Sequence, residues 1–444
     1  MNPKYAVPAF LGRNNFMPGG PDVNSVINAI MYDMEEGLKT DPSNPPGQGP
    51  SLDMIPTWAE PPTSGPKNKS VIVIDAGGTN FRSCLVSFDA DGIPTISDMQ
   101  KTAMPGTERE YSKQEFFATI ASFLDHLKDK ATRIGFCFSY AMTITPEGDG
   151  KVIQFSKEIK AKEVIGTLVG ANLSDALVAR GWKRPEKIIL LNDTTAALLA
   201  GASAATKGKA YDSYVGFILG TGMNAAYIES TVIDKIIGVA AFAPSNQIVV
   251  CESGKCNKIA RSLFDETLDK TTNSPGLYGY EKMCSGAYLG TLGKLALGKA
   301  AEEGLFSAPV ADLFAKLDKL ELKDMDQFFY GPYRTDTKIG TILAEGKEGD
   351  RETTFRILDA FVERSARLAA ANIASVIIKS GMGNNPVRPV CVVCEGTTFL
   401  KTHNLRDRVT GYLNTVLTEN RGIWYEIVTM DNAVTLGSAV AGLI

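Results

Sequence analysis

The chain has 444 residues, a net charge of −4 and 44% hydrophobic and 22% charged residues, a composition typical of a globular protein. Because this length exceeds one ordinary core, we expect two or more domains. The slightly acidic balance without a long basic run argues against nucleic acid as a partner. It argues equally against an anionic membrane surface, and uncharged apolar stretches such as IIGVAAFA at 236–243 are far too short to span a bilayer.

Cysteine usage and the N-terminal segment both favour a cytoplasmic protein. Seven cysteines, an odd number, are scattered along the chain. The segment MNPKYAVPAFLGRNNF has neither the apolar core nor the cleavage pattern of a signal peptide. Cys391 and Cys394 form a C-x-x-C pattern inside a predicted strand, so their side chains should point to opposite faces. We therefore expect buried cysteines there and no zinc site.

The first part of the chain combines a helix with a connector. Apolar residues from Val23 to Met34 follow one another at spacings of four, three and four, which predicts one helix over 22–38. Proline, glycine and serine crowd residues 41–70 and predict an extended connector.

Strands and helices then alternate over residues 71–205. An antiparallel hairpin, VIVIDAGG followed by SCLVSF, opens this part, and a third strand follows DADG. Ser112 and Glu115 form a capping-box pattern before an amphipathic helix. Buried strands are predicted at RIGFCFS and KIILL, with helices at LSDALVARGW and from Asp193 to about Ala205. This order predicts a mixed α/β sheet.

The opening hairpin design recurs in the second half of the chain. YVGFIL, GTGMN and AAYIES, together residues 214–230, again predict a strand, a glycine turn and a strand. Two such hairpins suggest two related domains that face each other. Helices are predicted over 281–325, 352–380 and 433–444, and VRPVCVVCEG is predicted to be a strand.

Glycines and small polar residues occupy the bends of both hairpins. The first bend is DAGGTNFR (75–82), the second is GTGMN (220–224), and EGTT (395–398) is a third glycine-rich strand end. Glycine lets several backbone N–H groups approach a phosphate, and Thr and Asn add donors. Asp75 could hold water around Mg²⁺, the usual companion of ATP. One such bend is equally well an ordinary hairpin turn, but three together favour phosphate binding.

The segment DAGGTNFR resembles the first phosphate loop of the superfamily of sugar kinases, actin and heat-shock ATPases. Four further segments resemble the hexokinase family in order and spacing. They are SLDMIPTW (51–58), LNDTTAALLAG (191–201), GFILGTGMNAAYIE (216–229) and YEKMCSGAYLG (280–290). The resemblance covers about residues 22–444.

The resemblance implies an α/β, two-domain, actin-like (ribonuclease-H-like) fold with a ligand cleft between a small and a large domain. The small domain should comprise residues 67–192 plus 432–444, and the large domain residues 193–431. Residues 1–66 should supply a helix and a connector packed on the large domain.

Asp193 follows a buried strand, and strand ends of this kind line ligand crevices in α/β sheets. Asp is also a common helix N-cap, so position alone leaves a purely structural role open. The resemblance implies that Asp193 is the general base that accepts the proton of the attacking sugar hydroxyl. It also implies catalytic roles for Lys157 and Arg82, and sugar contacts from Thr143, Ser156, Asn192, Asn224, Glu252 and Glu281. Finally, it implies nucleotide contacts from Asp75, Gly77, Gly78, Thr79, Asn80, Thr221, Gly222, Gly396 and Thr397.

Several positions depart from the family pattern. Ala141 replaces a proline, and Tyr278 replaces a glutamine. Phe155, Glu158 and Ile159 replace a tryptophan, a glycine and a phenylalanine. These departures lie on the sugar side and bear on sugar preference, whereas DNAV replaces a glycine-serine loop on the adenine side.

The resemblance thus predicts a hexokinase that transfers the γ-phosphate of Mg-ATP to the 6-hydroxyl of a hexose, with glucose as the expected substrate. The expected partners are a hexose and ATP. Two alternatives are a catalytically weak sugar sensor of the same fold and an actin-like or chaperone ATPase. Asp193 and Lys157 argue against the first, and Glu252 and Glu281 argue against the second.

Overall fold

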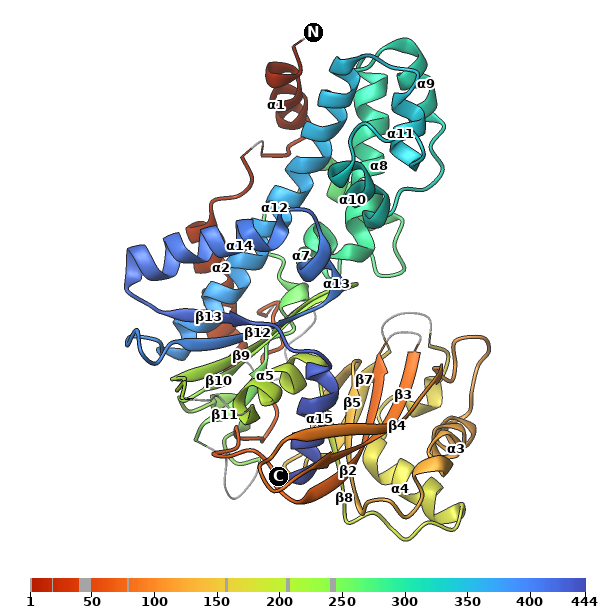
Figure 1. Ribbon diagram of the computed structural model, residues 1–444, viewed down its shortest axis with the longest axis vertical. Coiled ribbons are helices and arrows are strands. Elements are labelled where there is room, and N and C mark those ends of the chain that lie inside the picture. Colours follow the sequence, from red (N-terminus) through yellow and green to blue (C-terminus); the bar gives the residue numbers. More distant parts are fainter. Residues whose placement is uncertain are drawn as a thin grey trace.

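The computed structural model describes residues 2–17, 19–39, 49–77, 80–155, 159–204, 208–239 and 245–444. Two β-sheets form the centres of two lobes, and two helices lie between them, α5 (Asp193–Ser203) and α15 (Ala433–Leu443) (Figure 1). The chain is therefore a mixed α/β protein, as predicted.

The first sheet carries the strand order β4-β3-β2-β5-β8. Its β2–β3 hairpin is antiparallel and places Asp75 opposite Arg82, while β5 and β8 run parallel to β2 and to each other. Alternate residues of β2 face two separate cores, one under α3 and α4 and one against α5 and α15. The elements are β2 (Lys69–Gly77), β3 (Asn80–Phe88), β4 (Pro94–Ala103), α3 (Lys113–Phe123), β5 (Arg133–Phe138), α4 (Val169–Ala179) and β8 (Lys187–Leu191).

The second sheet repeats the arrangement of the first at its centre. Its order is β1-β11-β10-β9-β12-β13, with β9 and β10 antiparallel and β12 parallel to β9. A hairpin flanked by a parallel strand therefore occurs in both sheets, which agrees with the predicted relation between the two halves. The strands are β1 (Ile55–Pro56), β9 (Ser213–Leu219), β10 (Met223–Glu229), β11 (Gln247–Val250), β12 (Val390–Glu395) and β13 (Tyr425–Val428).

Helices cover the second sheet and extend beyond it as a helical tip (Figure 1). The helix predicted over 22–38 is α2 (Val23–Lys39), which packs on the 33-residue α12 (Glu348–Ser380). The stretch predicted as helical over 281–325 is divided into several shorter helices. These and the remaining helices are α1 (Pro3–Arg13), α6 (Leu263–Lys270), α7 (Gly279–Cys284), α8 (Gly286–Glu302), α9 (Ala308–Ala315), α10 (Leu322–Tyr330), α11 (Lys338–Leu343), α13 (Thr397–Lys401) and α14 (Leu405–Leu413).

Helices α5 and α15 pack closely on each other at the boundary between the lobes. A Cβ atom added to Gly437 of α15 would stand 1.7 Å from the carbonyl oxygen of Ala196 in α5, so only glycine allows this approach. Helix α15 also packs on β2 and β5, and α5 packs on β9. The two helices thus join the sheets, and the domain division that we propose falls at their N-caps, Asn192 and Asn432.

Several other local predictions are confirmed. Ser112 and Glu115 form the capping box of α3. Cys391 and Cys394 are buried, free and on opposite faces of β12, in two different cores. The short strand β1, inside the predicted connector, and helix α1 were not predicted. Three further strands also escaped prediction, β6 (Ala141–Ile144), β7 (Gly150–Gln154) and β13.

Two negative findings apply to the described residues. No helix among them is long and apolar enough to cross a membrane. No group of three or more His, Cys, Asp or Glu side chains among them is arranged to hold a metal ion.

Candidate active site

The first glycine bend brings a carboxylate and a guanidinium together at the tip of the β2–β3 hairpin. Nη1 of Arg82 lies 3.3 Å from Oδ2 of Asp75. Burial raises the pKa of Asp75 and the charge of Asp193 adds to this rise, while Arg82 counteracts it. Gly77 and Asn80 face each other at the end of the hairpin. Gly78 and Thr79, also predicted here, lie outside the described residues.

Asn192 and Asp193 mark the junction of β8 and α5. Oδ1 of Asn192 accepts hydrogen bonds from the backbone N–H of Thr194 (2.9 Å) and from its hydroxyl (2.6 Å), so Asn192 is the N-cap of α5. Asp193 is the first helical residue, and the alternative that it serves as the N-cap is therefore wrong. Its charge raises the pKa of Asp75 in the first lobe and of Glu252 in the second.

The second glycine bend lies beside the predicted sugar-binding carboxylates. Nδ2 of Asn224 donates to Oε1 of Glu252 at 2.9 Å. Oε2 of Glu281 accepts from the backbone N–H of Met223 at 3.0 Å. A Cβ atom on Gly222 would stand 2.5 Å from that same oxygen, so the carboxylate occupies the space that any side chain at position 222 would need. The structure therefore brings Asn224, Glu252, Glu281 and Gly222 together.

Glu252 has an unusual electrostatic environment. Burial raises the pKa of its carboxyl to about 7, the charge of Lys255 opposes this rise, and those of Asp53 and Asp193 add to it. Its backbone is left-handed, with φ at 53°, which costs a non-glycine residue free energy. An acidic side chain at a strand end, with its pKa raised close to 7, is typical of a functional site.

The end of β12, which is predicted to contact the nucleotide, lies directly beside the second glycine bend. Gly396 has φ at 107°, and a Cβ atom there would lie 2.3 Å from the carbonyl oxygen of Leu219. The hydroxyl of Thr398 donates to the carbonyl of Gly220 at 2.8 Å. Thr221 and Thr397 are both exposed beside these contacts. The ends of the parallel strands β9 and β12 thus form one continuous edge, open to a ligand.

Some residues that were predicted to contact the sugar are not placed beside Asn224, Glu252 and Glu281 by the structure. Thr143 is exposed on β6 between Met142 and Ile144, which line the hollow between the lobes, so strand alternation turns Thr143 away. Ser156 and Lys157 lie outside the described residues, as does Glu158 among the departures.

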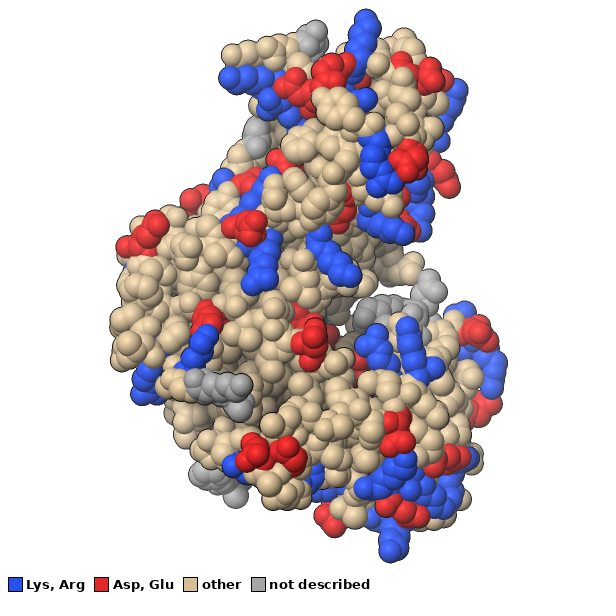
Figure 2. Space-filling model, in the orientation of Figure 1, with Lys and Arg blue, Asp and Glu red and all other residues tan. Residues whose placement is uncertain are grey.

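The hollow between the lobes shows which residues the sequence reasoning missed. Figure 2 shows a notch between the lobes. Residues of both lobes line a small hollow of about 20 Å³, which has room for roughly one water-sized molecule. Tyr140 lies in the segment that replaces the family's proline, and its ring contacts that of Phe155 at 5.2 Å. No periodic pattern could have identified these lining side chains, because they meet only in three dimensions. They are Ile55, Thr57, Tyr140, Met142, Ile144 and Val250, which line the hollow together with the predicted Asn192 and Glu252.

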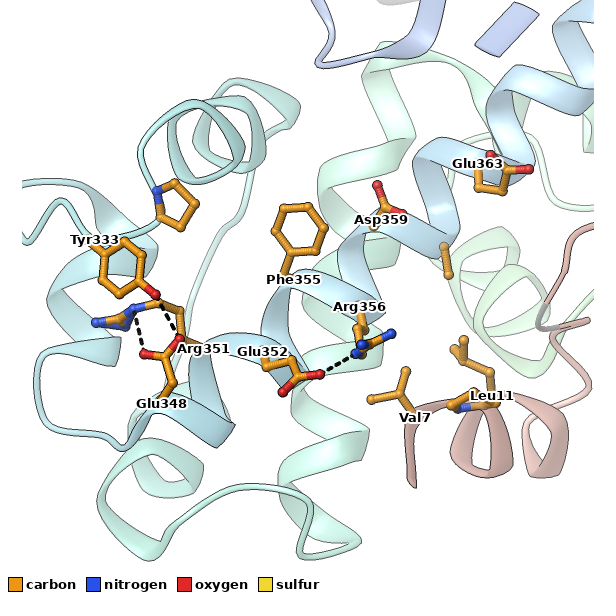
Figure 3. Close-up of a pocket in the computed structure, with 13 residues that line it drawn as sticks. Val7, Leu11, Tyr333, Glu348, Arg351, Glu352, Phe355, Arg356, Asp359 and Glu363 are labelled. Atoms are coloured by element: carbon orange, nitrogen blue, oxygen red, sulfur yellow. Dashed lines mark hydrogen bonds and ion pairs between the residues drawn. The ribbon is translucent and has the colours of Figure 1, made fainter. Parts of the chain in front are cut away.

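A larger cavity of about 490 Å³ lies elsewhere, between α1 and α12 (Figure 3). It contains none of the predicted site residues. Its charged side chains are paired locally, for example Arg356 with Glu352 at 2.8 Å and Arg351 with Glu348 at 4.0 Å. Its size alone therefore does not make it the catalytic site.

Comparisons with known proteins agree with this geometry. Two family models described as "Hexokinase" match residues 13–203 and 214–444. Hexokinase-1 of Schizosaccharomyces pombe is 26% identical over 94% of this chain and 86% of its own length. Hexokinase-like 1 protein of Arabidopsis thaliana is 30% identical over 81% and 74%. Hexokinase-2 of Homo sapiens is 29% identical over 81% of this chain, which spans 40% of the human protein.

Solved structures give the same result for the fold. A Schistosoma mansoni hexokinase complexed with glucose matches with a TM-score of 0.81 at 22% identity, over all of both chains. A second hexokinase crystal structure matches with a TM-score of 0.76 at 21% identity, over 100% of this chain and 99% of the other. Fold and site together define a sugar kinase, an ATP-dependent phosphotransferase with an actin-like architecture. More narrowly, the chain belongs to the hexokinase family, which implies ATP as the co-substrate.

Proposed function

We propose that the chain transfers the γ-phosphate of ATP to the 6-hydroxyl of a hexose, with glucose as the first candidate, in the cytoplasm. The observation that carries the proposal is the convergence of three strand ends from two lobes. Asn192, the neighbour of Asp193, lines the same hollow as Glu252, and the charge of Asp193 raises the pKa of both Asp75 and Glu252. A base, an anion-binding bend and sugar-binding carboxylates thus share one cleft.

Asp193 is the general base in this proposal. Its carboxylate accepts the proton of the sugar hydroxyl as that oxygen attacks the phosphate, a role that contributes about 10²–10⁴ in rate. It starts a helix directly after a buried strand, so its backbone is fixed by the sheet. Asn224, Glu252 and Glu281 orient the sugar through hydrogen bonds to its hydroxyls.

Backbone N–H groups at the two glycine bends would hold the phosphates. Arg82, whose side chain is 49% exposed, supplies positive charge beside the first bend. Lys157 is proposed to bridge sugar and phosphate. Phosphoryl transfer depends mainly on such positioning and charge stabilisation.

The residues fit a magnesium ion held chiefly by phosphates and water. Mg²⁺ retains several waters and needs only one or two carboxylates from the protein, and Asp75 lies at the phosphate bend with 17% of its side chain exposed. When bound with ATP, the ion neutralises phosphate charge. The protein's own contribution is the oriented Asp75 carboxylate, kept in place by Arg82.

An ADP-release assay across a panel of hexoses tests the proposal. We expect turnover with at least one neutral hexose and slow ATP hydrolysis without sugar. Sugar binding without turnover would instead support the sugar sensor. Rapid hydrolysis independent of sugar would support an ATPase.

A further inference from the structure

The side chain of Trp58 forms a hydrogen bond from one lobe to the other. Trp58 follows β1, which pairs with β11 of the second sheet and therefore belongs to the second lobe. Its indole Nε1–H donates to the backbone carbonyl of Ile144 at 2.9 Å. Ile144 is the last residue of β6, a strand of the first lobe. A single side chain thus ties the connector of one lobe to a strand of the other.

The backbone of Trp58 is held in a conformation that bulky residues avoid. Its φ of 59° is left-handed, which strains a residue with a large side chain. Its N–H donates to Oε1 of Gln247 at 3.2 Å. On one side, the N–H and the hydroxyl of Thr57 donate to the carbonyl of Ile248 at 3.0 and 2.7 Å. On the other, the N–H of Ile248 donates to the carbonyl of Ala59 at 2.8 Å. Strain that is maintained by so many contacts is typical of a position with a function.

The strand that Trp58 holds needs an anchor. Strands β6 and β7 form a two-stranded sheet separate from both large sheets, and such a pair has little stability of its own. Met142 pairs with Val152 in the middle of the hairpin, and both pack into the core of the first lobe. Ile144, which pairs with Gly150, lies at the end of β6 that contacts Trp58. The indole therefore fixes this end of the hairpin to the second lobe.

Strand β6 is also one wall of the hollow between the lobes. Met142 and Ile144 line it from the first lobe, and Thr57, next to Trp58, lines it from the second. The predicted sugar-binding residues Asn192 and Glu252 line the same hollow. Its volume of about 20 Å³ is so small that a slight shift of β6 would change its shape. The bond from Trp58 thus controls where this wall stands relative to the sugar site.

We propose that Trp58 is a positioning residue of the sugar site. Its indole N–H holds β6 against the connector and so fixes the spacing between the β6 wall and the polar groups of Asn192 and Glu252. This proposal rests on the hexose kinase function proposed above. The two glycine bends that would hold the phosphates belong to the β2–β3 and β9–β10 hairpins, which Trp58 does not bond. Loss of its N–H should therefore impair the sugar site and spare the nucleotide site.

Trp58→Phe tests the proposal, with Trp424→Phe as the matched control. Phenylalanine keeps an aromatic ring and lacks the donor. Trp424 is 40% exposed and directly precedes β13, the outermost strand of the second sheet, so the same substitution there leaves β6 untouched. We expect the KM for glucose to rise about 3- to 10-fold in Trp58→Phe, the effect of losing one hydrogen bond. The KM for ATP should change less than about twofold, and the control should stay near the wild type.

Hydrogen–deuterium exchange separates local positioning from general support of the fold, and it needs no activity. The amides of β6 and β7 should exchange about 3- to 10-fold faster in Trp58→Phe, whereas those of β2 and β5 should keep their rates. Gln247→Met is a second variant, which removes the acceptor of the Trp58 N–H without touching β6. It should give the same local increase, and it replaces Trp58→Phe if thermal melting shows that this variant does not fold.

Unchanged exchange in β6 and β7, or an equal rise in all strands of the first lobe, would overturn the proposal. So would equal changes in the KM values for glucose and ATP, or an equal effect of Trp424→Phe. Failure of the proposed function is distinguishable, because the wild type would then phosphorylate no hexose, while the exchange pattern would still report whether Trp58 holds β6.

Discussion

Asn224 and Glu252 are joined by a direct hydrogen bond, 2.9 Å from Nδ2 to Oε1. Oδ1 of the same asparagine accepts from the backbone N–H groups of Ser253 and Ala225 at 3.2 and 2.8 Å, so the amide cannot flip without losing three bonds. The asparagine therefore fixes the Glu252 carboxylate, and the start of β10 fixes the asparagine. These hydrogen bonds hold Glu252 in a buried position, where burial disfavours the ionised form of its carboxyl group.

We expect Glu252→Gln to stabilise the protein while weakening sugar binding. Burial raises the pKa of Glu252 from 4.5 to about 7, so its contribution to stability is present below about pH 4.5 and is lost as the pH rises through about 7. Glutamine has no charge to bury. Denaturant unfolding should show a gain of about 1–2 kcal/mol at about pH 8 and a smaller gain at about pH 5. A loss of stability at the higher pH would contradict this explanation.

Asp193→Asn should abolish most turnover and leave the fold intact. We expect kcat to fall about 10²- to 10⁴-fold, because asparagine cannot accept the proton, while the glucose Kd changes only a few-fold. Steady-state kinetics and calorimetric titration measure the two quantities separately. Asp175→Asn, on an exposed face of α4, is the control. Near-normal kcat in Asp193→Asn would remove the residue from the base role.

Much of this arrangement follows from local patterns in the sequence. Apolar runs and glycine bends indicate the hairpins, whereas the cleft and the roles of its acids were implied by the resemblance to the hexokinase family. Strand β1 was missed because it has only two residues and is defined by β11, with which Ile55 pairs at Val250. The ion pair between Lys255 and Asp53 was missed because the two residues lie 202 positions apart in the chain. Contacts between residues so far apart in the chain produce no pattern in a short window of sequence.

Tyr278→Gln should change the sugar preference. A phenol is longer than an amide and cannot donate and accept across two hydroxyls in the same way, and the charges of Glu252 and Glu281 both raise the pKa of Tyr278. We expect the ratio of kcat/KM for glucose against mannose or fructose to shift. Tyr333→Gln, at an exposed tyrosine of the distant cavity between α1 and α12, is the control. Identical ratios in both variants would place Tyr278 outside the pocket.

Gly222→Ala should displace Glu281, because the new methyl group would stand 2.5 Å from its Oε2. The carboxylate is at the end of a flexible side chain, so we expect a raised KM for glucose and little loss of thermal stability. Gly298→Ala in α8, where a Cβ atom meets nothing within 4 Å, is the control and should bind sugar normally. Wild-type glucose affinity in Gly222→Ala would show that the Glu281 position is not needed.

Sugar binding should close the cleft. Asn192 lies at the end of a strand of the first sheet, whereas Asn224, Glu252 and Glu281 belong to the other lobe, so the site is complete only when the lobes approach. Small-angle scattering should show a smaller radius of gyration with saturating glucose. ATP hydrolysis without sugar should be slow. The closure mechanism fails if the scattering is unchanged and sugar-free hydrolysis is fast.

The contact between α5 and α15 also has a consequence for biosynthesis. Strands β2 and β5 leave the ribosome early, yet the helix that covers one of their faces, α15, exists only after residue 443 has been made. Until then that apolar face, which includes Val71 and Val73, lacks its native cover. Contacts between segments so far apart in the chain slow folding and leave apolar surface exposed to aggregation in the meantime. The first lobe can therefore complete its native packing only after α15 has been synthesised.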